Sequence, residues 1–324
     1  MKIKREIREI YEDKRDKIKL WCKKRCRFFK SHQINLRFIV ILFLCVVFIF
    51  SATMLVLHYM RAAREDKAMQ ELAALIPTTV TDDNTVPAAT ATVLQSNQSP
   101  IILAQYREAH AQNTDMVGWI KIDGTRVDYP VMYTADDFYM FHGFDKKKSV
   151  SGVPFVDKRC AVDPFGTNSI IYGHNMKNGT MFADLVKYAD QEYYRKHPIV
   201  QFDTLYEQQS FEIIAVFKSQ TYRKSDNVFK HYNFLNADDA AAFDEYIANI
   251  TALSLYDTGV TASYGDKLLT LVTCSYHTKN GQFVVVAKKL NDAYNLNSGT
   301  QLWALFSAKN LIKTAFALVQ NGAS

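Results

Sequence analysis

One uncharged, mostly apolar run constrains this chain more than any other feature. It extends over twenty residues from Phe38 to Leu57. At the rise of an α-helix, such a run is long enough to cross the roughly 30 Å hydrocarbon core of a bilayer. A cleavable signal peptide has a shorter apolar stretch closely followed by small residues, whereas His58 and Arg61 follow this one. The run therefore predicts an uncleaved transmembrane helix over residues 38–57.

The charges that precede this run predict its orientation. Residues 1–37 contain fourteen Lys and Arg against five Asp and Glu, whereas the whole chain carries a net charge of only +6. By the positive-inside rule, this basic tail stays in the cytoplasm and everything after residue 60 lies outside the cell. Nucleic-acid binding is the weaker interpretation, because basic residues beside a span also attract anionic lipid heads. We expect a single-pass protein of the cell membrane that binds no nucleic acid.

Composition divides the outer part of the chain into a stalk with a tether, a folded domain and a tail. Residues 58–100 begin with helical character, and from residue 77 they are rich in Thr, Ser, Ala and Asn, which is typical of a flexible tether. A folded domain is expected over residues 101–290. Residues 291–324 include the apolar stretch from Leu302 to Gln320, which predicts an amphipathic helix, docked on the domain or lying on the membrane, rather than a second span.

The pattern of residues 101–290 predicts a mainly β domain. About eight short segments have strand character, and few helices interrupt them, which favours a β-barrel with helical insertions. Pro130 lies inside one of these strands and therefore indicates an edge or a bulge. The clearest helix is expected over residues 237–252, capped by Asn236 or Asp238. Further helices are expected over 101–112, 180–188 and 190–196, and strands over 117–122, 127–132, 153–156, 169–172, 199–205, 209–218, 268–273 and 282–288.

Cys274 is the candidate nucleophile. It ends one predicted strand and precedes a polar turn that finishes with Asn280 and Gly281. The thiol would thus lie at a strand end beside a loop, where rigid scaffolds commonly present reactive groups. A cysteine that only fills core space is the alternative from this segment alone. Cys160 is the other cysteine of the outer part, and a disulfide between the two, which would remove the nucleophile, is the less favoured alternative.

A reactive thiol needs a neighbouring base or cation, and His174 has the most suggestive setting among the histidines. It follows a predicted strand and lies between Gly173 and the polar residues 175–179. His277 is closer to Cys274 in sequence, but its position in the turn is more typical of a solvated residue. The sequence shows neither a cluster of metal ligands nor a phosphate-binding glycine loop, so we expect no metal and no cofactor.

Three segments carry motifs in a recognisable order: NTDMVGWIKIDGTRVDYPV at Asn113–Val131, GHNMKNGTMF at Gly173–Phe182, and TLVTC at Thr270–Cys274. The last resembles the TLxTC signature of sortases. The first two resemble the start of the domain and the segment around the catalytic histidine in class B sortases. The resemblance covers approximately residues 101–290 and implies a sortase-like catalytic domain built on a closed eight-stranded β-barrel, at the surface of a Gram-positive bacterium.

The resemblance also implies a reaction. Cys274 would attack the carbonyl of a threonine in a sorting motif near the C-terminus of a secreted protein, and His174 would protonate the leaving amine. The thioacyl-enzyme would then pass the secreted protein to an amine of a peptidoglycan precursor or of another protein. Thr273, beside the nucleophile, would position it locally and border the substrate.

One position departs from the family. Sortases carry an arginine on the strand after the cysteine, where this chain has Gln282, and no arginine follows Arg223. Loss of a charge-assisted donor at an oxyanion typically costs a few kcal/mol, on the order of a hundredfold in rate. Lys279 is a candidate substitute cation that could contact the substrate. The alternative to an active transpeptidase is therefore an impaired sortase-fold protein that binds sorting motifs or assists another enzyme.

Overall fold

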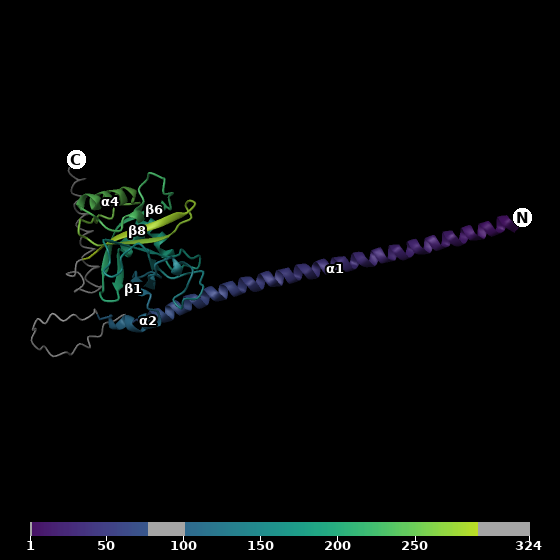
Figure 1. The fold of residues 1–324 in the computed structure, drawn as a ribbon, viewed down its shortest axis with the longest axis horizontal. Helices are drawn as coiled ribbons and strands as arrows, with labels where there is room; N and C mark the ends of the chain where they lie inside the picture. Colours follow the sequence, from purple (N-terminus) through teal and green to yellow (C-terminus); the bar gives the residue numbers. More distant parts are fainter. Residues whose placement is uncertain (1, 77–100, 291–324) are drawn as a thin grey trace, which may run out of the picture. The chain divides into compact units, whose positions relative to one another are not determined.

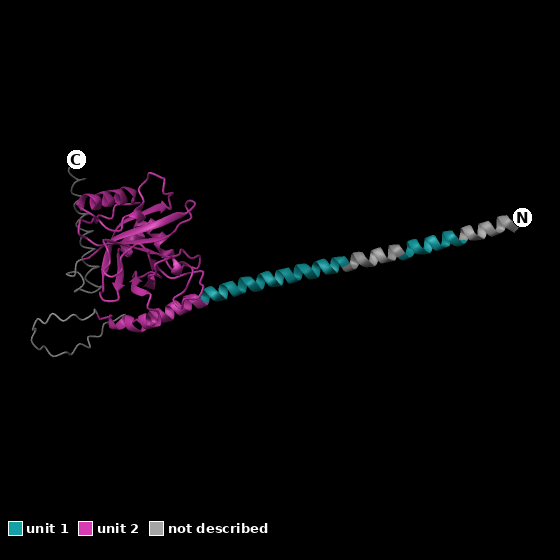
Figure 2. Cartoon of the chain, viewed as in Figure 1, with its two compact units in different colours: residues 1–63 teal, residues 64–324 magenta. Residues whose placement is uncertain are grey.

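A computed structural model of the chain describes residues 2–76 and 101–290 (Figure 1). These residues belong to two compact units, residues 1–63 and residues 64–324 (Figure 2). The expected tether over residues 77–100 and the expected C-terminal helix over residues 302–320 lie outside the described residues.

The first unit consists of most of one long helix, α1 (Lys2–Ala74). From Leu36 onwards this helix is long and apolar enough to cross a membrane, and its apolar side chains, such as Phe43 and Phe48, are exposed. An isolated apolar surface of this kind requires a lipid or protein covering. The helix predicted over residues 38–57 is confirmed, and it continues without a break through the expected helical stalk.

The second unit contains a closed barrel, as the sequence predicts. Its strand order is β1-β2-β3-β4-β7-β8-β6-β5, and in Figure 1 the long strands β6 and β8 lie side by side. The β2–β3 and β4–β7 pairs are parallel, and the other neighbours are antiparallel. The strands are β1 (Met116–Lys121), β2 (Asp128–Met132), β3 (Phe155–Val156), β4 (Asn168–Tyr172), β5 (Ile199–Thr204), β6 (Ser210–Gln220), β7 (Leu268–Cys274) and β8 (Gly281–Lys289).

Pro130 shows how the closed barrel accommodates a proline within a strand. It pairs with Trp119 of β1 on one side of β2. On the other side, β2 pairs with β3 at Met132, so Pro130 falls in a part of β2 without a described β3 partner. Proline has no N–H to donate to a neighbouring strand, and no described pairing on that side of Pro130 needs one. This is the behaviour expected at an edge position.

Short helices connect the strands, and two of them differ from the prediction. The expected helix over residues 101–112 starts later, because the N–H of Leu103 donates to the Leu205 carbonyl at the end of β5. Asp239, rather than Asn236 or Asp238, caps α4, since the Asn236 side chain accepts from the N–H of Thr167. The helices are η1 (Ala104–Tyr106), α2 (Arg107–Gln112), η2 (Phe138–Met140), η3 (Ala183–Ala189), α3 (Gln191–Lys196), η4 (His231–Asn233) and α4 (Ala240–Leu253).

The two strands that frame the candidate nucleophile form part of the barrel core. Residues 268–273 of β7 are buried without exception, as are residues 283–287 of β8. Each fully buried aliphatic or aromatic side chain stabilises the fold by about 1.5–3 kcal/mol. The ends of β7 and β8 are therefore held by a rigid core.

Candidate active site

Cys274 is the last residue of β7 and the exposed end of an otherwise buried strand. The turn that follows is tight: Asn280 has a φ of 55°, and the N–H of Ser275 donates to the Gly281 carbonyl at 2.8 Å. A Cβ at Gly281 would lie only 2.3 Å from the Ser275 carbonyl oxygen, so glycine is required there. The thiol lies at a strand end beside a loop, as the sequence predicts.

The environment of Cys274 favours the thiol over the thiolate. The residue as a whole is exposed, but neighbouring protein atoms partly desolvate its sulfur, and this raises the pKa of the thiol above its usual range. Because the thiolate is the nucleophilic form, this desolvation works against nucleophilic attack. A proton acceptor or a substrate must shift this balance.

His174 is brought to Cys274 by the register of two parallel strands. Tyr172 of β4 pairs with Val272 of β7, and the N–H of Gly173 donates to the Val272 carbonyl at 3.1 Å. The Thr273 hydroxyl donates to the Gly173 carbonyl at 2.7 Å. β4 ends at Tyr172, and the same register carried two residues further sets His174 level with Cys274.

Asn175 adds a second link between the two segments. Its side-chain amide donates to the backbone carbonyl of Cys274 at 3.0 Å. Its backbone also forms a β-bridge with Met181, which returns the polar loop to the barrel. The segment 173–175 is thus fixed to residues 272–274 on both sides of His174.

The imidazole of His174 is oriented by a backbone carbonyl. Its Nε2 lies 2.7 Å from the carbonyl oxygen of Met140 in η2. Since a carbonyl can only accept, Nε2 carries the proton and Nδ1 is the nitrogen left to exchange a proton. The Phe141 ring packs near the imidazole, with 6.1 Å between the ring centroids. Sequence reasoning missed both residues: Met140 acts through a backbone atom, and the only signal for Phe141 is its place in the aromatic-rich stretch 138–144.

Gln282 lies directly opposite Cys274 in the β7–β8 ladder. In an antiparallel pair, opposed side chains project from the same face with Cβ atoms about 4.5–5.5 Å apart. The Gln282 side chain therefore leaves β8 on the same face as the thiol. Its Oε1 is buried and has no hydrogen-bond partner in the described part of the chain.

Lys279, the candidate substitute cation, and Arg223, the last arginine of the chain, are more loosely placed. Lys279 is exposed in the turn between β7 and β8, and Arg223 is exposed in a turn after β6 that Asp226 closes. Within the described ranges, neither side chain forms an ion pair or hydrogen bond with Cys274, His174 or Gln282.

Cys160 is a free, buried thiol that takes no part in this arrangement. Its sulfur donates to the Asn168 carbonyl at 3.6 Å and accepts from the N–H of Ile170. Burial raises its pKa to about 11. The less favoured disulfide between Cys160 and Cys274 is not formed, and Cys274 is free.

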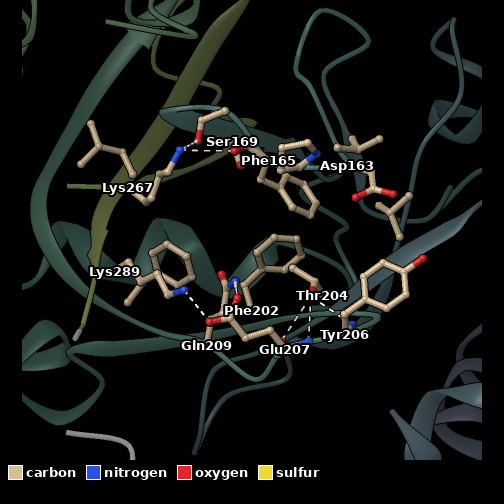
Figure 3. A pocket seen from close by; sticks show the side chains of 16 residues that line it. Asp163, Phe165, Ser169, Phe202, Thr204, Tyr206, Glu207, Gln209, Lys267 and Lys289 are labelled. Atoms are coloured by element: carbon tan, nitrogen blue, oxygen red, sulfur yellow. Dashed lines mark hydrogen bonds and ion pairs between the residues drawn. The ribbon is translucent and has the colours of Figure 1, made fainter. Parts of the chain in front are cut away.

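A separate pocket of about 360 Å³ lies at the opposite end of the barrel (Figure 3). Leu268, the first residue of β7, and Lys289, the last residue of β8, both line it, whereas Cys274 ends β7 six residues away. At strand rise this separation is about 20 Å. Phe165 and Phe202 line it together with the charged side chains of Lys267 and Glu207 (Figure 3).

Comparisons with known proteins agree with this architecture. A family model described as the sortase domain matches residues 120–290. The chain is 34% identical over 187 residues to Sortase B of Listeria monocytogenes, covering 57% of this chain and 73% of that protein. It is 30% identical over 199 residues to Sortase B of Staphylococcus aureus, covering 60% and 79%.

Solved structures are similar as well. Sortase B of Bacillus anthracis in complex with AAEK1 superposes with a TM-score of 0.57 at 28% identity, covering 72% of this chain and 99% of that one. A Staphylococcus aureus sortase B–substrate complex superposes with a TM-score of 0.60 at 24% identity and the same coverage, which shows the shared fold. The chain therefore belongs to the sortase family of cysteine transpeptidases, and its relatives place it with sortase B.

Proposed function

We propose that this protein is a membrane-anchored transpeptidase that cleaves a C-terminal sorting motif of secreted proteins after a threonine and transfers them to a cell-wall amine. The observation that carries the proposal is the extended β4–β7 register, in which the Thr273–Gly173 and Asn175–Cys274 hydrogen bonds hold His174 beside Cys274. The nucleophile and a proton carrier thus meet at one end of a rigid barrel.

In the proposed reaction, Nδ1 of His174 accepts the thiol proton as the Cys274 sulfur attacks the threonine carbonyl and forms a tetrahedral oxyanion. The C–N bond then breaks, a thioester remains on Cys274, and Nδ1 of His174 delivers a proton to the leaving amine. An amine of a peptidoglycan precursor or of another protein attacks the thioester and regenerates the thiol. The Met140 carbonyl supports this role of His174, since it holds Nε2 and leaves Nδ1 available.

Gln282 is the proposed replacement for the family's arginine. Its position opposite Cys274 is suitable for an amide N–H that donates to the oxyanion. A neutral donor stabilises negative charge less well than a guanidinium does, so we propose a slower enzyme than a sortase with arginine here. The same observation favours the second candidate, an impaired sortase-fold protein that binds sorting motifs or assists another sortase.

Thr273 and Lys279 receive different proposed roles. The Thr273 hydroxyl is engaged by the Gly173 carbonyl, and the residue is buried, which supports positioning of the nucleophile rather than direct substrate contact. Lys279 is exposed in the turn that follows Cys274, where an ammonium could contact an acidic group of the substrate. We propose it as a peripheral substrate-binding residue.

The proposed location follows from the charges at the two ends of the apolar helix. The basic tail over residues 1–37 would remain in the cytoplasm, α1 would cross the membrane, and the barrel would lie outside, where secreted proteins and cell-wall precursors are accessible. The match of residues 120–290 to the sortase domain supports a protein or peptide substrate for this domain.

A transfer assay tests the proposal. The full chain in detergent is incubated with a library of Thr-containing sorting peptides and an oligoglycine amine, and mass spectrometry detects the new amide. The transpeptidase gives a product with the wild-type chain and none with Cys274→Ala. Binding of peptides by both proteins without any product would instead establish the impaired sortase-fold protein.

A further inference from the structure

The turn that orients His174 is held on both sides by one serine. Met140, whose carbonyl accepts from His174 Nε2, lies in the turn that follows β2. The backbone N–H of Ser149 donates to the Phe141 carbonyl at 2.9 Å. The Ser149 hydroxyl accepts from the N–H groups of Ser151 and Gly152, each at 3.1 Å. Ser149 thus holds the backbone around Met140, whose carbonyl orients the His174 imidazole.

The backbone of Gly152 packs directly against the turn that contains Met140. A Cβ at Gly152 would lie 2.5 Å from the Tyr139 carbonyl oxygen and 2.7 Å from that of Met140, so its backbone packs on this peptide unit. The next residue, Val153, donates its N–H to the Tyr139 carbonyl at 3.1 Å. A shift of the Ser149–Gly152 segment would therefore move the Met140 carbonyl.

The last turns of α1 supply the remaining partner of Ser149. Residues 64–74 of this helix belong to the second unit, where Met69 and Leu72 are buried in the hydrophobic core. Glu65, one turn earlier, accepts a hydrogen bond from the Ser149 hydroxyl at 2.7 Å. A carboxylate acceptor makes such a bond short and strong, and it fixes the direction in which the hydroxyl proton points.

We propose that Glu65 and Ser149 are positioning residues for His174, so that the end of the membrane helix takes part in ordering the active site. With its proton donated to Glu65, the Ser149 oxygen presents its lone pairs to Ser151 and Gly152, which hold the turn that carries Met140. This inference rests on the proposed role of His174. It gives the docked end of α1 a function beyond anchoring.

The turn also has an anchor that does not depend on α1. The Tyr139 hydroxyl donates to Asp115 at 2.7 Å and accepts from the Asn113 amide at 2.8 Å, and Tyr139 is fully buried. Loss of Glu65 should therefore loosen the Met140 carbonyl without unfolding the domain. This difference makes the inference testable.

The test compares Glu65→Ala with Glu65→Gln, whose amide oxygen can still accept from Ser149, and with Glu71→Ala, an exposed control on the same helix. Nitrogen-15 chemical shifts of labelled histidine report the tautomer of His174 in the full chain in detergent, assigned with His174→Ala. We expect a single Nε2–H tautomer in the wild-type chain, in Glu65→Gln and in Glu71→Ala, and a mixture in Glu65→Ala. In the transfer assay, Glu65→Ala should lower kcat about tenfold and leave KM within about twofold.

Ser149→Ala is a second variant, used if its thermal unfolding remains cooperative. Like Glu65→Ala, it should give a mixture of His174 tautomers. A wild-type tautomer and kcat in Glu65→Ala would overturn the inference, as would an equal loss in Glu65→Gln. If the wild-type chain gives no product, the proposed function fails. The tautomer measurement still decides the inference, because it requires no turnover.

Discussion

Gln282 and Cys274 form a directly opposed pair across β7 and β8. The two side chains therefore leave their strands on the same face, and the buried amide oxygen of Gln282 has no hydrogen-bond partner in the described structure. In the proposed mechanism, this pair brings together the nucleophile and the donor to the oxyanion.

Gln282→Arg should accelerate peptide cleavage by about tenfold or more, because a charged donor stabilises the oxyanion better than a neutral one. The measurement is kcat/KM with a peptide identified in the transfer assay. Ala248→Arg, on the exposed face of α4, adds the same charge away from the site and should leave kcat/KM unchanged. An unchanged rate in Gln282→Arg would mean that this position does not contact the oxyanion.

His174→Ala should lower kcat by about 10²- to 10⁴-fold, the usual contribution of a general acid or base. Alkylation of Cys274 by a small electrophile needs no leaving-group proton, so Cys274 should still be alkylated in this variant. Parallel measurements of cleavage and alkylation separate the reaction of the thiol from the protonation of the leaving amine. Equal losses in both would indicate that the substitution damages the site as a whole.

Thr273→Val should slow cleavage and destabilise the domain by about 1–3 kcal/mol, because it leaves the Gly173 carbonyl without the Thr273 hydroxyl. Thr273→Ser keeps the hydroxyl and should retain most of the activity. Urea unfolding and steady-state kinetics of both variants provide the comparison. If valine and serine behave alike, the Thr273–Gly173 hydrogen bond does not hold the His174 segment in place.

His231 should make the domain sensitive to acid. Its ring is buried against Phe217 and Tyr232 without a hydrogen-bond partner among the described residues, and burial lowers its pKa from 6.5 to about 4. Between these two values the unfolded chain binds a proton that the folded chain does not. The unfolding free energy should therefore fall by about 3 kcal/mol as the pH decreases from 6.5 to 4.

His231→Leu removes this titration and the unsatisfied ring nitrogens together. We expect its unfolding free energy to exceed that of the wild-type chain, and the difference to be larger at pH 5 than at pH 7.5. Denaturant unfolding at the two pH values measures it. A pH-independent difference would show that His231 does not titrate in this range.

The sequence predicted those features that leave a local pattern. The uncharged run identified the long helix, alternating apolar residues identified most of the strands, and the TLVTC motif with the GHNMKNGTMF segment indicated the family. Other features depend on contacts between distant segments. The carbonyl of Met140 orients His174 through a backbone atom that every residue possesses, so no side chain could indicate it. Likewise, Asn236 does not cap α4, because its side-chain oxygen accepts from the N–H of Thr167, which lies 69 positions earlier in the chain, just before β4.

The most direct test of the account is the mass of Cys274 after reaction with a sorting peptide. The full chain is mixed with the peptide in the absence of an acceptor amine, quenched in acid and digested, and the peptide that contains Cys274 is analysed by mass spectrometry. We expect a thioester adduct that ends in threonine on Cys274 and is lost when an acceptor amine is added. An adduct on another residue, or cleavage that persists in Cys274→Ala, would contradict this expectation.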